Sequence, residues 1–188
     1  MALRLLFSAS ALLVLPACAH YSGATAQTAP QAAPKAATTQ IESLQATVLG
    51  SAGKSIGNID LKQSPHGILI RVELDAGALT PGWHGLHLHQ VGDCSDTGIY
   101  KLSGGHVGKV ADGHGLLNPA GPEGGDTPNI YAAADGSAGM EMITARVTLA
   151  QLADADGSAL IIHAGEDDHI TQPIGGAGSR VACAAIGG

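Results

Sequence analysis

The chain carries little positive charge and few aromatic side chains. Its 188 residues include nine Lys and Arg against sixteen Asp and Glu, for a formal net charge of −7, and aromatic residues make up 3%. No basic patch interrupts this balance. Because phosphate binding depends on clustered Lys and Arg, a nucleic acid is not an expected partner. Long apolar runs are also missing: the segment from Leu5 to Leu15 is too short for a helix that crosses a bilayer.

That N-terminal segment has the features of an export signal. The basic residue Arg4 precedes the apolar run and small residues follow it, so residues 1–17 predict export from the cytoplasm. The end of the segment, Leu15-Pro16-Ala17-Cys18, resembles a bacterial lipobox, in which Cys18 is lipidated and anchors the mature protein to an envelope membrane. The alternative is ordinary cleavage at Ala17-Cys18-Ala19, which would discard this cysteine.

Residues 18–40 are mostly Ala, Pro, Gln and Thr. This composition buries too little apolar surface to fold, so we expect a disordered tether. Residues 41–188 are then of ordinary size for one domain with one core. Cysteine is scarce: if Cys18 carries a lipid, Cys94 and Cys183 remain as the single candidate pair. An exported protein can form and keep such a disulfide.

Short apolar segments separated by turn-forming residues make up the domain. Candidate strands are residues 44–49, 57–61, 67–74, 85–91, 140–148, 159–164 and 180–185. This pattern predicts an all-β sandwich or barrel, and residues 149–155 can hold one helical turn. Residues 92–135 show little periodicity. Loops of that length are usually functional or disordered, and the histidines and carboxylates in or beside this one favour a functional loop.

The segment around His87-Leu88-His89 is the most informative. Side chains alternate faces along a strand, so the two histidines project from one side while Leu88 points to the other. A pair of imidazoles on one wall suits copper or zinc. Further candidate ligands lie at strand edges or in the long loop: His106, His114, Asp126 and His163.

Six segments together resemble the bacterial periplasmic copper/zinc superoxide dismutases. They occur in the order and approximate spacing of that family, and the resemblance covers nearly all of residues 41–188. The segments are His84-Gly85-Leu86-His87-Leu88-His89, Gly104-Gly105-His106, His114-Gly115-Leu116-Leu117-Asn118-Pro119, Gly125-Asp126-Thr127-Pro128-Asn129, Ile162-His163-Ala164-Gly165-Glu166-Asp167-Asp168 and Gly178-Ser179-Arg180-Val181-Ala182-Cys183.

The resemblance implies a fold, a reaction and a location. The fold is a Greek-key β-sandwich or barrel of about eight antiparallel strands with long metal-binding loops. The reaction is dismutation of superoxide to dioxygen and hydrogen peroxide, in the periplasm, with copper and zinc as cofactors. The expected substrate is therefore the superoxide anion.

The resemblance also implies roles for individual residues. Copper would be held by His87, His89, His106 and His163, and zinc by His106, which bridges the two metals, together with His114 and Asp126. Asp167 matches the carboxylate that links ligands of the two metals. Arg180 matches the arginine that holds the anionic substrate beside copper. Cys94 and Cys183 match the disulfide of the family.

One position departs from the family's pattern. The family has a histidine three residues before the zinc-binding aspartate, where this chain has Glu123. A carboxylate also ligates zinc, so the site can consist of two histidines and two carboxylates. Alternatively, Glu123 points to solvent and the zinc site is weak or empty, which would favour a copper-binding protein with weak or no catalysis. The sequence leaves the oligomeric state open.

Overall fold

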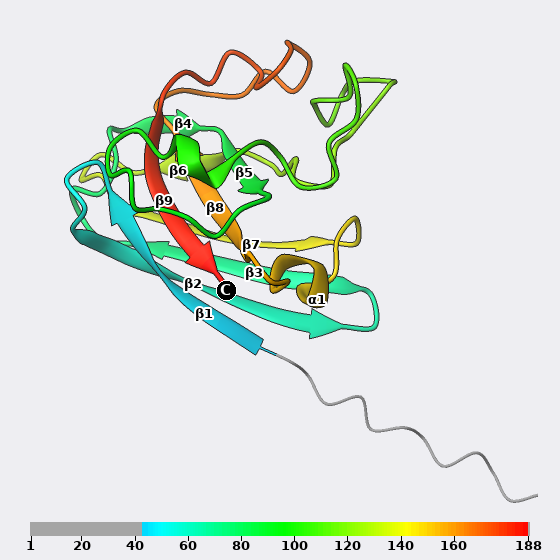
Figure 1. Ribbon diagram of the computed structural model, residues 1–188. Coiled ribbons are helices and arrows are strands. Elements are labelled where there is room, and N and C mark those ends of the chain that lie inside the picture. The colour runs from blue at the N-terminus through cyan, green and yellow to red at the C-terminus, as the bar shows by residue number, and fades with distance from the viewer. Residues whose placement is uncertain (1–42, 188) are drawn as a thin grey trace, which may run out of the picture. The chain divides into compact units, whose positions relative to one another are not determined.

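The computed structural model describes residues 43–187, which form a nearly closed antiparallel β-barrel with almost no helix (Figure 1). The strands of this region are β1 (Ser43–Gly50), β2 (Ser55–Ser64), β3 (Gly67–Leu74), β4 (Gly82–His84), β5 (Leu86–His89), β6 (Ile130–Ala132), β7 (Ala138–Thr144), β8 (Ser158–His163) and β9 (Arg180–Ile186). They are hydrogen-bonded in the order β4-β6-β7-β3-β2-β1-β9-β8-β5. Only Gly85 separates β4 from β5, so the two ends of this order meet in the chain.

Alternation along β3 shows how the barrel interior is filled. Ile68, Ile70 and Val72 are buried in the core, whereas Arg71 and Glu73 between them are exposed. Burying one such aliphatic side chain stabilises the fold by about 1.5–3 kcal/mol.

Strand β8 is buried on both faces. Leu160 and Ile162 join the main core, whereas Ile161 belongs to a smaller apolar cluster with Tyr100 and Cys183. The loop that follows β5 therefore covers the outer face of β8, and the histidine at the end of this strand is shielded from water.

The expected all-β fold of about eight antiparallel strands is confirmed, and the described residues form nine. Strand β6 has three residues, too few to show a period along the sequence. The segment predicted as one strand over 85–91 is the shorter β5, preceded by the separate strand β4. Gly85 turns the chain between them: its N–H donates to Gly165 O at 2.8 Å, and a Cβ there would lie 2.9 Å from that of Ala177. The predicted helical turn is α1 (Leu149–Leu152).

Two long connections carry most of the candidate site, and the one between β8 and β9 lies above the barrel in the view of Figure 1. They are residues 90–129, between β5 and β6, and residues 164–179, between β8 and β9. Leu117 N–H donates to His169 O at 3.1 Å, so the two connections are hydrogen-bonded to each other. A disulfide between Cys94 and Cys183 attaches the first connection to β9.

The predictions of a signal in residues 1–17, a lipidated Cys18 and a tether in residues 18–40 lie outside the described residues. Within residues 43–187, no helix is long and apolar enough to cross a membrane.

Candidate metal centre

The site is built outward from β5. Leu86 and Leu88 lie in the core, while His87 and His89 project from the opposite face and are fully buried by the loops. The long connection adds to this strand: Leu88 N–H donates to Gly125 O and Val107 N–H donates to Leu88 O, both at 2.9 Å. These bonds bring His106 opposite His89, and Asp126 opposite His87. Antiparallel pairing of β5 with β8 brings His163 to the same wall.

Four histidine nitrogens on this wall are buried and have no hydrogen-bond partner. They are His87 Nδ1, His89 Nε2, His106 Nε2 and His163 Nε2. A buried polar atom without a partner is costly, so these four nitrogens are candidate metal ligands. Donor atoms of His87, His89 and His163 lie within 4.8 Å of one another. The residues present therefore fit a metal ion bound by imidazole nitrogens, as copper prefers.

The second nitrogen of three of these rings is fixed by a hydrogen-bond acceptor. His89 Nδ1 lies 2.9 Å from Gly104 O, and His163 Nδ1 lies 3.0 Å from Gly178 O. His87 Nε2 lies 2.7 Å from a carboxylate oxygen of Asp167. Such contacts place the proton on one nitrogen and leave the other free to bind a metal.

Burial also keeps these rings neutral. It lowers the pKa of His87 and His163 to about 4 and that of His89 to about 2. The charge of the Arg180 guanidinium also contributes to lowering the pKa of His89 and of His163. The neutral imidazole is the form that binds a metal ion. At neutral pH the wall is therefore ready to bind a metal without first losing protons.

A second group of donor atoms lies beside the first. His87, His106, His114 and Asp126 each contribute an atom to a cluster whose members lie within 4.8 Å of one another. Asp126 Oδ1 is 3.1 Å from His106 Nδ1 and 2.9 Å from His114 Nδ1. Two donors bound to one tetrahedral ion at about 2.0–2.1 Å lie roughly 3.3 Å apart. The spacing therefore fits a zinc ion.

The two charged partners in this group have opposite pKa shifts. Burial raises the pKa of Asp126, but hydrogen bonds from His106 and His114 outweigh it and hold that pKa well below its ordinary value. Burial lowers the pKa of His114, yet hydrogen bonds to Asp126 and Asp167 raise it to about 9. The acidic side chains thus attract positive charge to this point, which a divalent cation would satisfy.

Glu123 is buried in the same place, with its side chain 4% exposed. Its Oε2 lies 2.8 Å from His106 Nδ1, and its Oε1 accepts a hydrogen bond from Val110 N–H at 3.1 Å. Its own N–H donates to Asp126 Oδ2 at 2.8 Å. The alternative in which Glu123 points to solvent is wrong. Its carboxylate contacts the donor cluster through His106.

Asp167 joins the two groups of donors. Its Oδ2 lies 2.7 Å from His87 Nε2, and its Oδ1 lies 3.2 Å from His114 Nε2. Oδ1 also accepts a hydrogen bond from His169 N–H. Burial raises the pKa of Asp167, but the bonds from His114 and His87 outweigh it and bring that pKa well below its ordinary value. One buried anion therefore orients a histidine of each group.

Arg180 stands at the entrance to the first group. Its guanidinium donates to Tyr100 O at 2.5 Å, to Ser103 Oγ at 3.0 Å and to Gly104 O at 2.8 Å. It lines an open cavity of about 330 Å³ together with His163 and Lys101. Lys101 is not among the site residues predicted from the sequence. Only its position five residues before His106 could have suggested it.

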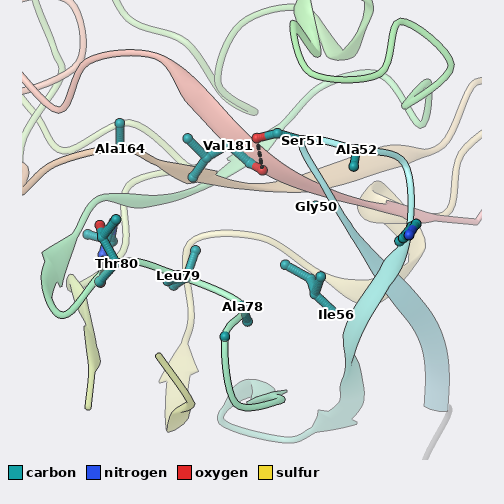
Figure 2. A pocket seen from close by; sticks show the side chains of 12 residues that line it. Gly50, Ser51, Ala52, Ile56, Ala78, Leu79, Thr80, Ala164 and Val181 are labelled. Atoms are coloured by element: carbon teal, nitrogen blue, oxygen red, sulfur yellow. Dashed lines mark hydrogen bonds between the residues drawn. The ribbon is translucent and has the colours of Figure 1, made fainter. Parts of the chain in front are cut away.

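A larger cavity, of about 460 Å³, lies away from these histidines (Figure 2). Ile56, Leu79 and Val181 give it an apolar lining, and Ser51 Oγ donates to Val181 O at 3.0 Å. None of the predicted metal ligands lines it. His84 does, and both of its ring nitrogens lie 2.8 Å from backbone carbonyl oxygens, so this histidine has a structural role.

The barrel and its two adjoining donor groups define a histidine-rich protein with two metal sites. Comparison with known proteins agrees: residues 55–186 match the family model for copper/zinc superoxide dismutase. The chain is 48% identical over 151 residues to a superoxide dismutase [Cu-Zn] of Caulobacter vibrioides, covering 77% of this chain and 85% of that protein. The chain belongs to the copper/zinc superoxide dismutase family.

Two solved structures share the fold. The Cu/Zn superoxide dismutase from Brucella abortus is 30% identical with a TM-score of 0.63, over 77% of this chain and 99% of that one. A superoxide-dismutase-like protein from Bacillus subtilis is 31% identical with a TM-score of 0.66, over 76% and 97%.

Proposed function

We propose that this protein dismutates superoxide to dioxygen and hydrogen peroxide, with copper and zinc held by the two donor groups. The copper ligands would be His87, His89, His106 and His163, and the zinc ligands His106, His114, Asp126 and Glu123. The observation that carries the proposal is the set of four buried ring nitrogens without partners on this wall, where donor atoms of His87, His89 and His163 lie within 4.8 Å of one another. Bound copper supplies the one-electron oxidation and reduction that dismutation requires.

Arg180 would hold the substrate. A small anion entering the cavity that contains Arg180 and His163 meets a guanidinium, which forms charge-assisted hydrogen bonds with oxygen anions. Three hydrogen bonds fix this guanidinium in the wall, so it stays aimed at the cavity. A protein that only stored or delivered copper would have no use for this cation.

His106 would take part in proton transfer as well as in binding. Its Nδ1 lies among the carboxylates of the zinc group, whereas its Nε2 belongs to the copper group and is buried without a partner. Nε2 is therefore the atom at which we place a proton for delivery to the reduced oxygen. The zinc group would hold the ring in position during that exchange.

The proposal includes the location and organisation of the chain. The N-terminal pattern supports export to the periplasm through residues 1–17, lipid attachment at Cys18 and a tether over 18–40 that connects the anchor to a domain of residues 41–188. Mass spectrometry of the membrane fraction tests the anchor. We expect Cys18→Ala to release the protein into the soluble fraction, and an unchanged distribution would contradict lipidation.

The test of the activity compares the copper- and zinc-loaded protein with two variants. We expect His163→Ala to lose both tightly bound copper and dismutase activity. His66→Ala, which alters an exposed histidine in the turn after β2, should keep both. If native protein binds copper but is no more active than His163→Ala, the enzymatic proposal is wrong and a copper-binding function remains.

A further inference from the structure

We propose that Glu123 shifts the metal preference of the zinc site away from copper and towards zinc. The inference rests on the proposed function, because it requires His106, His114 and Asp126 to bind a metal. It goes further by assigning Glu123 the choice between the two metals that the protein must keep apart.

The carboxylate of Glu123 is buried against the donor cluster. Oε2 of Glu123 and Oδ1 of Asp126 lie 2.8 and 3.1 Å from the same atom, His106 Nδ1. Oδ1 of Asp126 is also 2.9 Å from His114 Nδ1. The donor atoms of His106, His114 and Asp126 lie within 4.8 Å of one another, and the Glu123 carboxylate contacts this cluster through the His106 ring. A buried anion here would be destabilising without a cation.

The position is also rigid. Glu123 Oε1 accepts a hydrogen bond from Val110 N–H, and its backbone N–H donates to Asp126 Oδ2. The next residue, Gly124, packs so closely that a Cβ would lie 2.9 Å from Val107 O. The carboxylate oxygen therefore cannot swing away from the cluster without breaking contacts on both sides of it.

The chemistry of the donors gives the selectivity. Imidazole suits copper as well as zinc, and copper normally binds more tightly than zinc to a given set of ligands. Carboxylates are harder ligands that suit copper less. Copper(II) also prefers a tetragonal arrangement, whereas zinc accepts a tetrahedral one. Replacing an imidazole by a second fixed carboxylate should therefore narrow the advantage of copper at this site.

The two sites contrast in this respect. The proposed copper ligands are four imidazoles and no carboxylate, whereas the proposed zinc ligands, with Glu123 among them, are two of each. His106 belongs to both proposed groups of ligands. A copper ion bound in the zinc site would therefore share this ring with the copper ion in the copper site. A selective carboxylate prevents this error where copper is abundant.

The experiment offers both metals to metal-free protein at equal buffered free concentrations and measures copper and zinc per chain. We expect zinc to occupy a larger share of the second site in the native protein than in Glu123→His. For Glu123→His we expect the copper-to-zinc ratio in the second site to rise at least about tenfold, with copper approaching two ions per chain. Paramagnetic resonance gives a second readout, because two copper(II) ions bridged by His106 would couple and lose signal relative to bound copper.

Three further variants complete the design. Glu123→Ala removes the carboxylate altogether. Glu73→His adds an imidazole on the exposed side of β3 and should leave the ratio unchanged. Glu123→Gln keeps the size of the side chain but removes its charge, and should move the ratio in the same direction as Glu123→His. Circular dichroism of each variant establishes that it is folded before metals are added.

The outcomes separate the inference from the proposed function. If Glu123→Ala binds zinc as tightly as native protein, Glu123 is not a ligand and the proposed zinc group is wrong. If Glu123→Ala loses zinc but Glu123→His and native protein partition the two metals equally, the zinc group stands and the selectivity is refuted.

Discussion

Asp167 offers a sharp test of how the two metal sites are coupled, through the substitution Asp167→Asn. The amide has nearly the shape of the carboxylate but presents one acceptor and one donor in place of two acceptors. Two donors reach Oδ1, His114 Nε2 at 3.2 Å and His169 N–H, whereas one close donor, His87 Nε2 at 2.7 Å, reaches Oδ2. The amide carbonyl should therefore take the place of Oδ1.

The amide nitrogen would then face the Nε2–H of His87, donor against donor. Hydrogen bonds to charged groups contribute about 1.5–3 kcal/mol, and loss of an outer partner of a metal ligand costs about 10–100-fold in affinity. We expect copper affinity to fall by roughly that factor. Zinc affinity should fall less, because the bond from His114 keeps an acceptor, although a neutral one.

Competition with a chelator of known affinity measures both constants on the full-length protein. Asp168→Asn is the matched control, because the carboxylate of Asp168 is exposed and bonds only within its own loop, to Ile170 and Thr171. Unchanged copper affinity in Asp167→Asn, or a larger loss of zinc than of copper, would refute the reasoning.

Three other predictions concern stability and rate. Removing the disulfide with Cys94→Ser opens a loop whose ends are 89 residues apart and should lower the unfolding free energy by about 4–5 kcal/mol, measured in urea; a loss below 1 kcal/mol would contradict this. In the metal-free protein, folding lowers the pKa of His87 and His163 from 6.5 to about 4, so between these pH values only the unfolded chain gains protons there. Stability should accordingly fall as pH drops from 6.5 to 4, by roughly 3 kcal/mol for each histidine, and a flat profile in urea denaturation would exclude it. Lys101→Glu should lower kcat/KM several-fold and reverse its dependence on ionic strength, because Lys101 lines the cavity of Arg180; an unchanged salt dependence would show that Lys101 does not attract the anion.

The strands that the sequence predicts best are those in which apolar and polar residues alternate. The alternation in residues 67–74 and in the His87-Leu88-His89 segment is a property of neighbouring side chains, and the structure has β3 and β5 there. Strand β6 and the break at Gly85 were missed, because three residues carry no period and because the break depends on packing against Ala177, far along the chain.

The orientation of Glu123 shows a different limit. Its residue type allowed both a ligand and a solvent-facing side chain, and nothing within a few positions of the sequence favours either. The outcome depends on Val110 N–H, thirteen residues earlier, and on His106 Nδ1, seventeen residues earlier. The conformation of the loop decides the orientation of Glu123, and no periodic pattern in the sequence predicts that conformation.

The long loop is more than a support for ligands, because one of its carbonyl groups serves two functions. Gly104 O accepts hydrogen bonds from His89 Nδ1 at 2.9 Å and from Arg180 Nη2 at 2.8 Å. The first contact sets which nitrogen of a proposed copper ligand is free, and the second fixes the cation that would hold the substrate. Arg180 also donates to Tyr100 O and Ser103 Oγ in the same loop. Metal binding and anion binding therefore depend on the same segment of backbone. This segment keeps the Arg180 guanidinium at a constant distance from the histidine wall.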